Sequence, residues 1–185
     1  MIAVAIDPGV MPLAVAGRGS PLLRRLLALR DAGADPLVFC DRPDQETRDR
    51  SGGALRARLP TEADLPGLRA LWIAGLPADA AAALRARASA QRLLVNVEDV
   101  RELCDFHNLA EVRRGDLLLT VSTNGRSPGL AARIRARLAG QFGPEWATRL
   151  AALGERRRAW RAEGRSMPEI VRLTDETVEH AGWLR

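Results

Sequence analysis

Short apolar runs alternate with stretches of helical periodicity over the first half of the chain, and this alternation limits the possible folds more than any other feature. The runs have the length of buried strands, and leucines or alanines at helical spacing lie between them. They occupy 11–16, 37–40, 70–74 and 93–97, with helices expected over 21–29 and 79–90. Successive strand, helix and strand segments form a parallel sheet with right-handed crossovers. The sequence therefore predicts an α/β fold, which a fifth apolar run at 117–122 is expected to continue.

The last third of the chain has a different pattern, in which arginine-rich helices are expected. They are predicted over 129–139, 146–163 and 167–179, separated by breaks that contain glycine. All 28 basic residues are arginine, and the formal net charge is +5. Arginine pairs in a bidentate manner with carboxylates and phosphates, so the charge suits a nucleic acid, a polyanionic small molecule or simply a solvated basic surface. We expect no nucleic-acid partner, because an aromatic content of 4% offers no stacking platform.

The composition is typical of a protein from a reducing compartment. Cys40 and Cys104 provide no disulfide framework, which suits the cytoplasm. With only two histidines beside them, no metal-binding residue is expected. The apolar runs are shorter than the roughly 18 residues of a membrane span, so no membrane partner is expected either. We expect the N-terminal segment to be folded structure rather than a targeting signal, because no basic region precedes Asp7 and Pro8.

A glycine turn, Gly17-Arg18-Gly19-Ser20, separates the first predicted strand from the helix that follows it. Glycine lets a pyrophosphate approach the backbone, and the helix N-terminus presents free amides, while Pro21 suits the first helical turn. Asp41 follows the second strand and can accept both hydroxyls of an adenosine ribose, which favours NAD over NADP, although Arg42 beside it weakens that preference. The pattern predicts a Rossmann-like dinucleotide site, with a tight turn that binds no nucleotide as the alternative.

Three later segments carry a resemblance to a known family. They read V-N-V-E-D at 95–99, C-D-F at 104–106 and V-S-T-N-G-R-S-P-G-L-A at 121–131. In this order and spacing the chain resembles the precorrin-2 dehydrogenase / sirohydrochlorin ferrochelatase family, the N-terminal module of siroheme synthases. The resemblance covers roughly residues 10–161, and the chain looks like the stand-alone form, without a methyltransferase module.

The resemblance implies a Rossmann-like parallel sheet followed by a dimerisation segment and a small helical C-terminal domain. We place these parts at 1–112, 113–145 and 146–185. It also implies a cytoplasmic homodimer that oxidises precorrin-2 to sirohydrochlorin by passing a hydride to NAD. Some members of the family also insert ferrous iron to give siroheme, so ferrochelatase activity is a second expectation.

The resemblance and the residue patterns together give a set of expected site residues. Asp99 matches the family's catalytic aspartate. The residues expected to hold NAD are Gly17, Arg18, Gly19, Ser20, Pro21, Asp41, Arg42, Ala74 and Gly75. Amides and hydroxyls of a polar turn are expected to bind carboxylates of the tetrapyrrole, through Ser122, Thr123, Asn124, Gly125, Arg126 and Ser127.

Alternatives remain open for the role of Asp99 and for the function of the chain, whose first hypothesis is the dehydrogenase. Asp99 can instead be a helix N-cap, with Glu102 three residues later completing a capping box. The chain also departs from the family's usual nucleotide motifs at Arg18, at Leu22 and at Leu76-Pro77. These departures raise a second hypothesis, a chelatase or tetrapyrrole-binding protein with a degenerate nucleotide site. A regulatory or nucleic-acid-binding domain, suggested by the arginine content, is the third.

Overall fold

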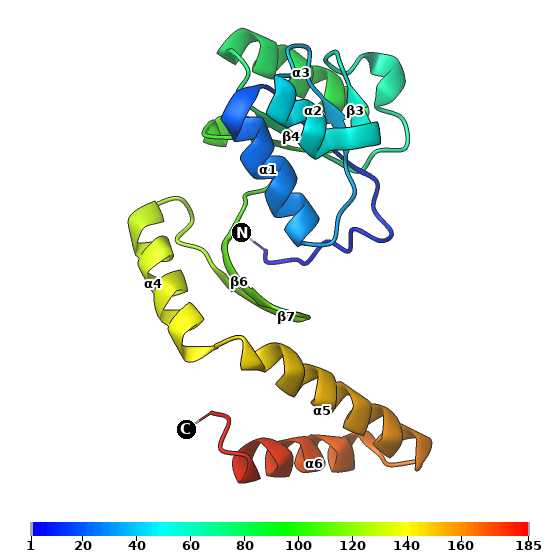
Figure 1. Ribbon diagram of the computed structural model, residues 1–185, viewed down its shortest axis with the longest axis vertical. Coiled ribbons are helices and arrows are strands. Elements are labelled where there is room, and N and C mark those ends of the chain that lie inside the picture. Colours follow the sequence, from blue (N-terminus) through cyan, green and yellow to red (C-terminus); the bar gives the residue numbers. More distant parts are fainter. Residues whose placement is uncertain (1, 185) are drawn as a thin grey trace. The chain divides into compact units, whose positions relative to one another are not determined.

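A five-stranded parallel sheet in the order β3-β2-β1-β4-β5 lies at the centre of the first of two units in the chain (Figure 1). This unit extends to His107, a second begins at Asn108, and the computed structural model describes residues 2–184. The strands are β1 (Leu13–Gly17), β2 (Leu37–Phe39), β3 (Leu55–Arg56), β4 (Ala70–Ala74) and β5 (Leu94–Val97). All their pairings are parallel, which confirms the predicted α/β fold.

Helices cover both faces of this sheet, which explains why β1 and β4 are continuous apolar runs rather than alternating ones. Leu22 and Leu26 of α1 (Gly19–Asp31) pack with Val15 on one face. Leu84 of α3 (Ala78–Ala90) packs with Ala14 on the other. The remaining elements of the unit are α2 (Gln45–Ser51) and three short 3-10 turns, η1 (Gly52–Ala54), η2 (Glu62–Asp64) and η3 (Arg101–Leu103).

The expectation that the apolar run at 117–122 continues the parallel sheet was wrong. It forms β7 (Leu117–Val121), which pairs antiparallel with β6 (Ala110–Arg114) in a separate two-stranded sheet of the second unit. Only Gly115 and Asp116 connect the two strands, and a parallel pair needs a crossover of a dozen residues or more. The fifth strand of the main sheet is instead β3, whose two residues are too few to give a pattern.

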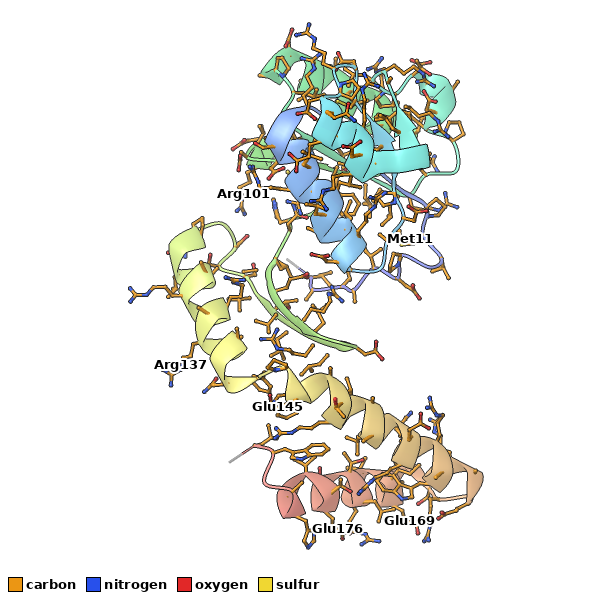
Figure 2. The ribbon with its side chains drawn as sticks, viewed as in Figure 1. Met11, Arg101, Arg137, Glu145, Glu169 and Glu176 are labelled. Carbon is orange, nitrogen blue, oxygen red and sulfur yellow. The ribbon has the colours of Figure 1, made fainter. Side chains whose placement is uncertain are left out.

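The second unit also contains the three helices expected from the sequence, which are α4 (Pro128–Gln141), α5 (Glu145–Ala162) and α6 (Met167–His180). Trp146 at the start of α5 packs on Phe142 and Trp183, with ring centroids 5.0 and 6.1 Å apart. Arginines on these helices are largely solvated, and Figure 2 shows Arg137 pointing away from α4. Within residues 2–184, no helix is long and apolar enough to cross a lipid bilayer.

Asn96 is a buried polar residue at the middle of β5, with 4% of its surface exposed. Its side-chain amide donates to the carbonyl oxygen of Phe106 over 2.8 Å, which ties the segment after η3 to the sheet. Burial of a polar group in a core costs free energy unless such a partner is present. The amide therefore stabilises the fold through its N–H donors.

We predict that Asn96→Asp, which keeps the side-chain shape, lowers the free energy of unfolding by about 3 kcal/mol, because a buried carboxylate would face a carbonyl oxygen. Urea unfolding followed by circular dichroism measures the change. Gln91→Glu makes the same chemical change at an exposed position and serves as the control. Equal stability of the two variants would contradict the role given to the Asn96 amide.

Candidate functional site

The carboxyl ends of β1, β4 and β5 bring the predicted cofactor and catalytic residues to one edge of the sheet. Gly17 lies opposite Ala74 in the register of β1 and β4, and Ile73 lies opposite Val97 in that of β4 and β5. The helices that follow β1 and β4 pack on opposite faces, so the chain reverses its winding between these two strands. Open α/β sheets bind ligands at such a switch point.

Two glycines allow the loops after β1 and β4 to touch each other. A side-chain carbon at Gly17 would overlap the carbonyl oxygen of Ala74, and one at Gly75 would overlap that of Arg18. The amide of Arg18 donates to the Ala74 carbonyl over 3.1 Å. Gly17 and Gly75 therefore shape the two loops, and the sequence-predicted residues of both loops do lie together.

Gly19 has a different environment, because its missing side chain faces open space. Its φ is +58°, and a carbon added there would meet only the Cδ atom of Pro21, at 3.9 Å. Gly19 and Ser20 are the first two residues of α1, so their amides have no hydrogen-bond acceptor within the helix. Pro21 has no amide to satisfy. The Arg18 side chain does not cap the helix, and no acidic residue lies in its first turn.

These features fit a dinucleotide. The positive end of the helix dipole and two unused amides suit a diphosphate, and the open face of Gly19 lets it approach the backbone. We call Gly17–Ser20 together with Ala74–Gly75 the glycine cradle. Its residues come from positions that the sequence predicted for the coenzyme.

Departures from the family's motifs do not fill the cradle. Leu22 is fully buried among the residues under α1. Leu76 packs against the core on the opposite face of the sheet, and Pro77 is the N-cap residue of α3. None of these three side chains therefore covers the open face of Gly19. Arg18 is the departure whose side chain stays near the cofactor residues.

Arg18 and Asp41 form a bidentate ion pair that sequence reasoning missed. Nε of Arg18 lies 2.7 Å from Oδ1 of Asp41, and Nη2 lies 2.5 Å from Oδ2. This pairing lowers the pKa of Asp41 below its ordinary value, chiefly through the hydrogen bonds from Arg18. The β1–β2 register brings the two residues together, since Arg18 and Asp41 lie two positions after the register partners Ala16 and Phe39. The sequence alone does not give that register.

Asp99 lies just after β5 and is exposed at the same edge of the sheet. Its φ of 64° is in the left-handed region, which aspartate adopts more readily than most residues. The predicted alternative of a helix N-cap was wrong, because Val100 is the N-cap residue of η3 and no side chain caps that turn. A non-glycine residue held in this conformation costs free energy, and such residues are concentrated at functional sites.

The C-D-F segment holds the turn that contains Asp99. The sulfur of Cys104 lies 3.1 Å from the carbonyl oxygen of Val97 and 3.2 Å from that of Val100, on either side of Asp99. Asp105 accepts a hydrogen bond from the amide of Val95 over 2.9 Å and forms an ion pair with Arg85 over 2.7 Å. Nothing in the sequence indicated this bracing role of Cys104. Burial raises the pKa of its thiol, which keeps it protonated.

Residues predicted to bind the substrate form a compact turn in the second unit. Asn124 and Gly125 both have positive φ, and the amide of Arg126 donates to the carbonyl of Thr123 over 3.0 Å. The hydroxyl of Ser127 caps α4 by accepting from the amide of Leu130 over 3.3 Å. The hydroxyl of Thr123 is likewise used within the turn. Arg126 is exposed, so it is the residue of this turn that presents a charge to solvent.

Comparisons with known proteins agree with this arrangement. The family model described as "Putative NAD(P)-binding" matches residues 4–110, and one described as "Sirohaem biosynthesis protein central" matches residues 114–141. The solved structure of SirC, precorrin-2 dehydrogenase, matches with a TM-score of 0.76 at 23% identity, covering 100% of this chain and 93% of that chain. At that identity the likeness supports the fold.

Curated relatives are similar over much of this chain. The siroheme synthase of Methylococcus capsulatus is 34% identical over 131 residues, which are 69% of this chain and 28% of that protein. The siroheme synthase of Ectopseudomonas mendocina is 34% identical over 146 residues, which are 78% of this chain and 31% of that protein. The chain thus spans less than a third of the length of these relatives. Because the first family model covers more than half of the sequence, the chain belongs to the putative NAD(P)-binding family that this model describes. The second family model and the siroheme synthase relatives confirm the resemblance of its motifs.

Proposed function

We propose that this chain is a precorrin-2 dehydrogenase of the cytoplasm, which oxidises precorrin-2 to sirohydrochlorin with NAD as the acceptor. The observation that carries the proposal is the glycine cradle at the switch point of the sheet, at the same edge as Asp99. Membership of an NAD(P)-binding family of sirohaem biosynthesis supports the substrate class. The names of the matched relatives and of the matched structure support it as well.

In the proposed reaction, precorrin-2 loses one hydride, which carries both electrons, and one proton. When bound, the nicotinamide ring supplies the hydride acceptor. The amides of Gly19 and Ser20 would hold its diphosphate, and the segment after β2 that contains Asp41 would bind its adenosine ribose. The carboxylate of Asp99 accepts the proton that leaves with the hydride, so that the charges balance. Because Cys104 holds the turn that contains Asp99, the backbone of Asp99 is fixed at the edge of the sheet.

The turn over 122–127 is proposed to bind carboxylates of the tetrapyrrole. The side chain of Arg126 can pair with one carboxylate, and the backbone amide of Gly125 can donate to another. We also propose a homodimer, with the segment 113–145 at its interface. Leu130 and Ile134 on α4 have 51% and 38% of their surface exposed, which suits a helix that packs on a partner. If the chain also has ferrochelatase activity, ferrous iron is a second substrate, which would be inserted into the tetrapyrrole bound at this turn.

A direct test supplies precorrin-2 and NAD together and follows the absorbance change to sirohydrochlorin. Conversion that requires both NAD and the folded protein would support the proposal. A folded sample that binds the tetrapyrrole but never reduces NAD would favour the second hypothesis, a chelatase or tetrapyrrole-binding protein.

We predict that Gly19→Ala weakens NAD binding by at least about tenfold, because its methyl group would occupy the open face that the diphosphate approaches. Gly33→Ala is a matched control, since Gly33 also has a positive φ and open space but follows the opposite end of α1. Both variants should lose about 1 kcal/mol of stability from backbone strain. Calorimetric titration with NAD measures the affinities. Equal affinities in the two variants would remove Gly19 from the coenzyme site.

For Asp99 we predict that the Asn variant keeps the fold and loses at least about a hundredfold in kcat, because the amide cannot accept a proton. Asparagine tolerates the left-handed backbone of this position, so the melting temperature should stay unchanged, whereas alanine would add strain. NAD affinity should also stay unchanged. Full turnover in Asp99→Asn would eliminate this residue as the proton acceptor.

A further inference from the structure

The ion pair between Arg18 and Asp41 bears on which coenzyme the cradle accepts. A free carboxylate at the end of β2 binds the two ribose hydroxyls of NAD and repels the 2′-phosphate of NADP. In this chain both oxygens of that carboxylate already face the guanidinium of Arg18, at 2.5 and 2.7 Å. The carboxylate is therefore neutralised by a side chain from the glycine turn itself.

The charged residues next to the Arg18–Asp41 pair do not restore a repulsion of the 2′-phosphate of NADP. Arg42 follows Asp41 directly, is exposed and adds a positive charge at this end of the site. Asp44, the nearest acidic residue along the chain, keeps its negative charge but is directed to the N-terminus of α2, where it accepts a hydrogen bond from the amide of Thr47 over 2.8 Å. Arg18, Asp41 and Arg42 together thus have a net positive charge, which favours a phosphate over a hydroxyl.

The guanidinium of Arg18 also retains donors for an oxyanion. Two of its five N–H groups point at Asp41, and Nη1 is not among the nitrogens that do so. The side chain is 24% exposed, so it lies at the surface of the site and not beneath it. One arginine can in this way bind the carboxylate on one side and a phosphate on the other.

We propose that Arg18 is a coenzyme-specificity residue, which lets the same cradle accept NADP as well as NAD, with dissociation constants within about tenfold of each other. The inference rests on the proposed function, because it concerns the coenzyme of that site. It differs from the usual reading of an acidic residue at the end of β2, which predicts that NADP is rejected.

Calorimetric titrations with NAD and with NADP, at one fixed ionic strength, test the inference on the wild type and on Arg18→Ala. Alanine adopts the extended backbone of this position without strain, since φ is −145° and ψ is 151°. We expect the wild type to bind both coenzymes. In Arg18→Ala, NADP binding should fall by about thirtyfold relative to NAD, because the 2′-phosphate loses its donors and faces an unpaired carboxylate.

Arg24→Ala is the matched control, because it removes the same charge from a position on α1 that is 63% exposed and whose ion pair is with Glu98 and not with Asp41. Its ratio of the two dissociation constants should stay within about twofold of the wild type. Adding Asp41→Asn to Arg18→Ala should recover part of the NADP affinity, since the repelling charge is then gone. Melting curves of all the variants check that they are folded.

The outcomes separate this inference from the proposed function. A wild type that binds NAD but prefers it to NADP by more than tenfold would overturn the specificity role alone, as would a ratio that Arg18→Ala leaves unchanged. A folded wild type that binds neither coenzyme would overturn the coenzyme site itself, and the proposed function with it.

Discussion

The close contact between the loops after β1 and β4 is the constraint on which the rest of the site depends. Gly17 and Gly75 allow it, because any side-chain carbon at either position would overlap a carbonyl oxygen of the facing loop. The contact fixes where α1 begins, and hence where the amides of Gly19 and Ser20 point. It also fixes the backbone position of Arg18, whose side chain extends from this turn to Asp41. The proposed coenzyme binding and the proposed specificity therefore both depend on one backbone contact.

A second set of contacts, after β5, holds the candidate catalytic residue. Asp99 has a left-handed backbone conformation that a free loop would relax. Cys104 and Asp105 prevent this, since they bond to backbone groups of Val95, Val97 and Val100 on both sides of the turn. The C-D-F segment is thus a structural support for the site.

Much of the fold could be predicted because burial on both faces gives a strand a continuous apolar run. Ala70–Ala74 is read from the sequence with its observed bounds, and the core helices are found to within a few residues. The prediction failed where that signal is absent, at β3, or where it is shared by two kinds of sheet, at β7. An apolar run shows that a segment is buried, but the length of its connection decides with which strand it pairs.

By itself the sequence determined the α/β class, the glycine turn, the acidic residue after β2 and the motifs that assign the family. These are local features, because each depends only on the type and spacing of residues that are close together in the chain. The tertiary structure alone decided that Arg18 pairs with Asp41, that Leu22 turns into the core and that Asp99 is braced and does not cap a helix. Such facts depend on strand register and on the direction of single side chains, which are set only when distant segments pack together.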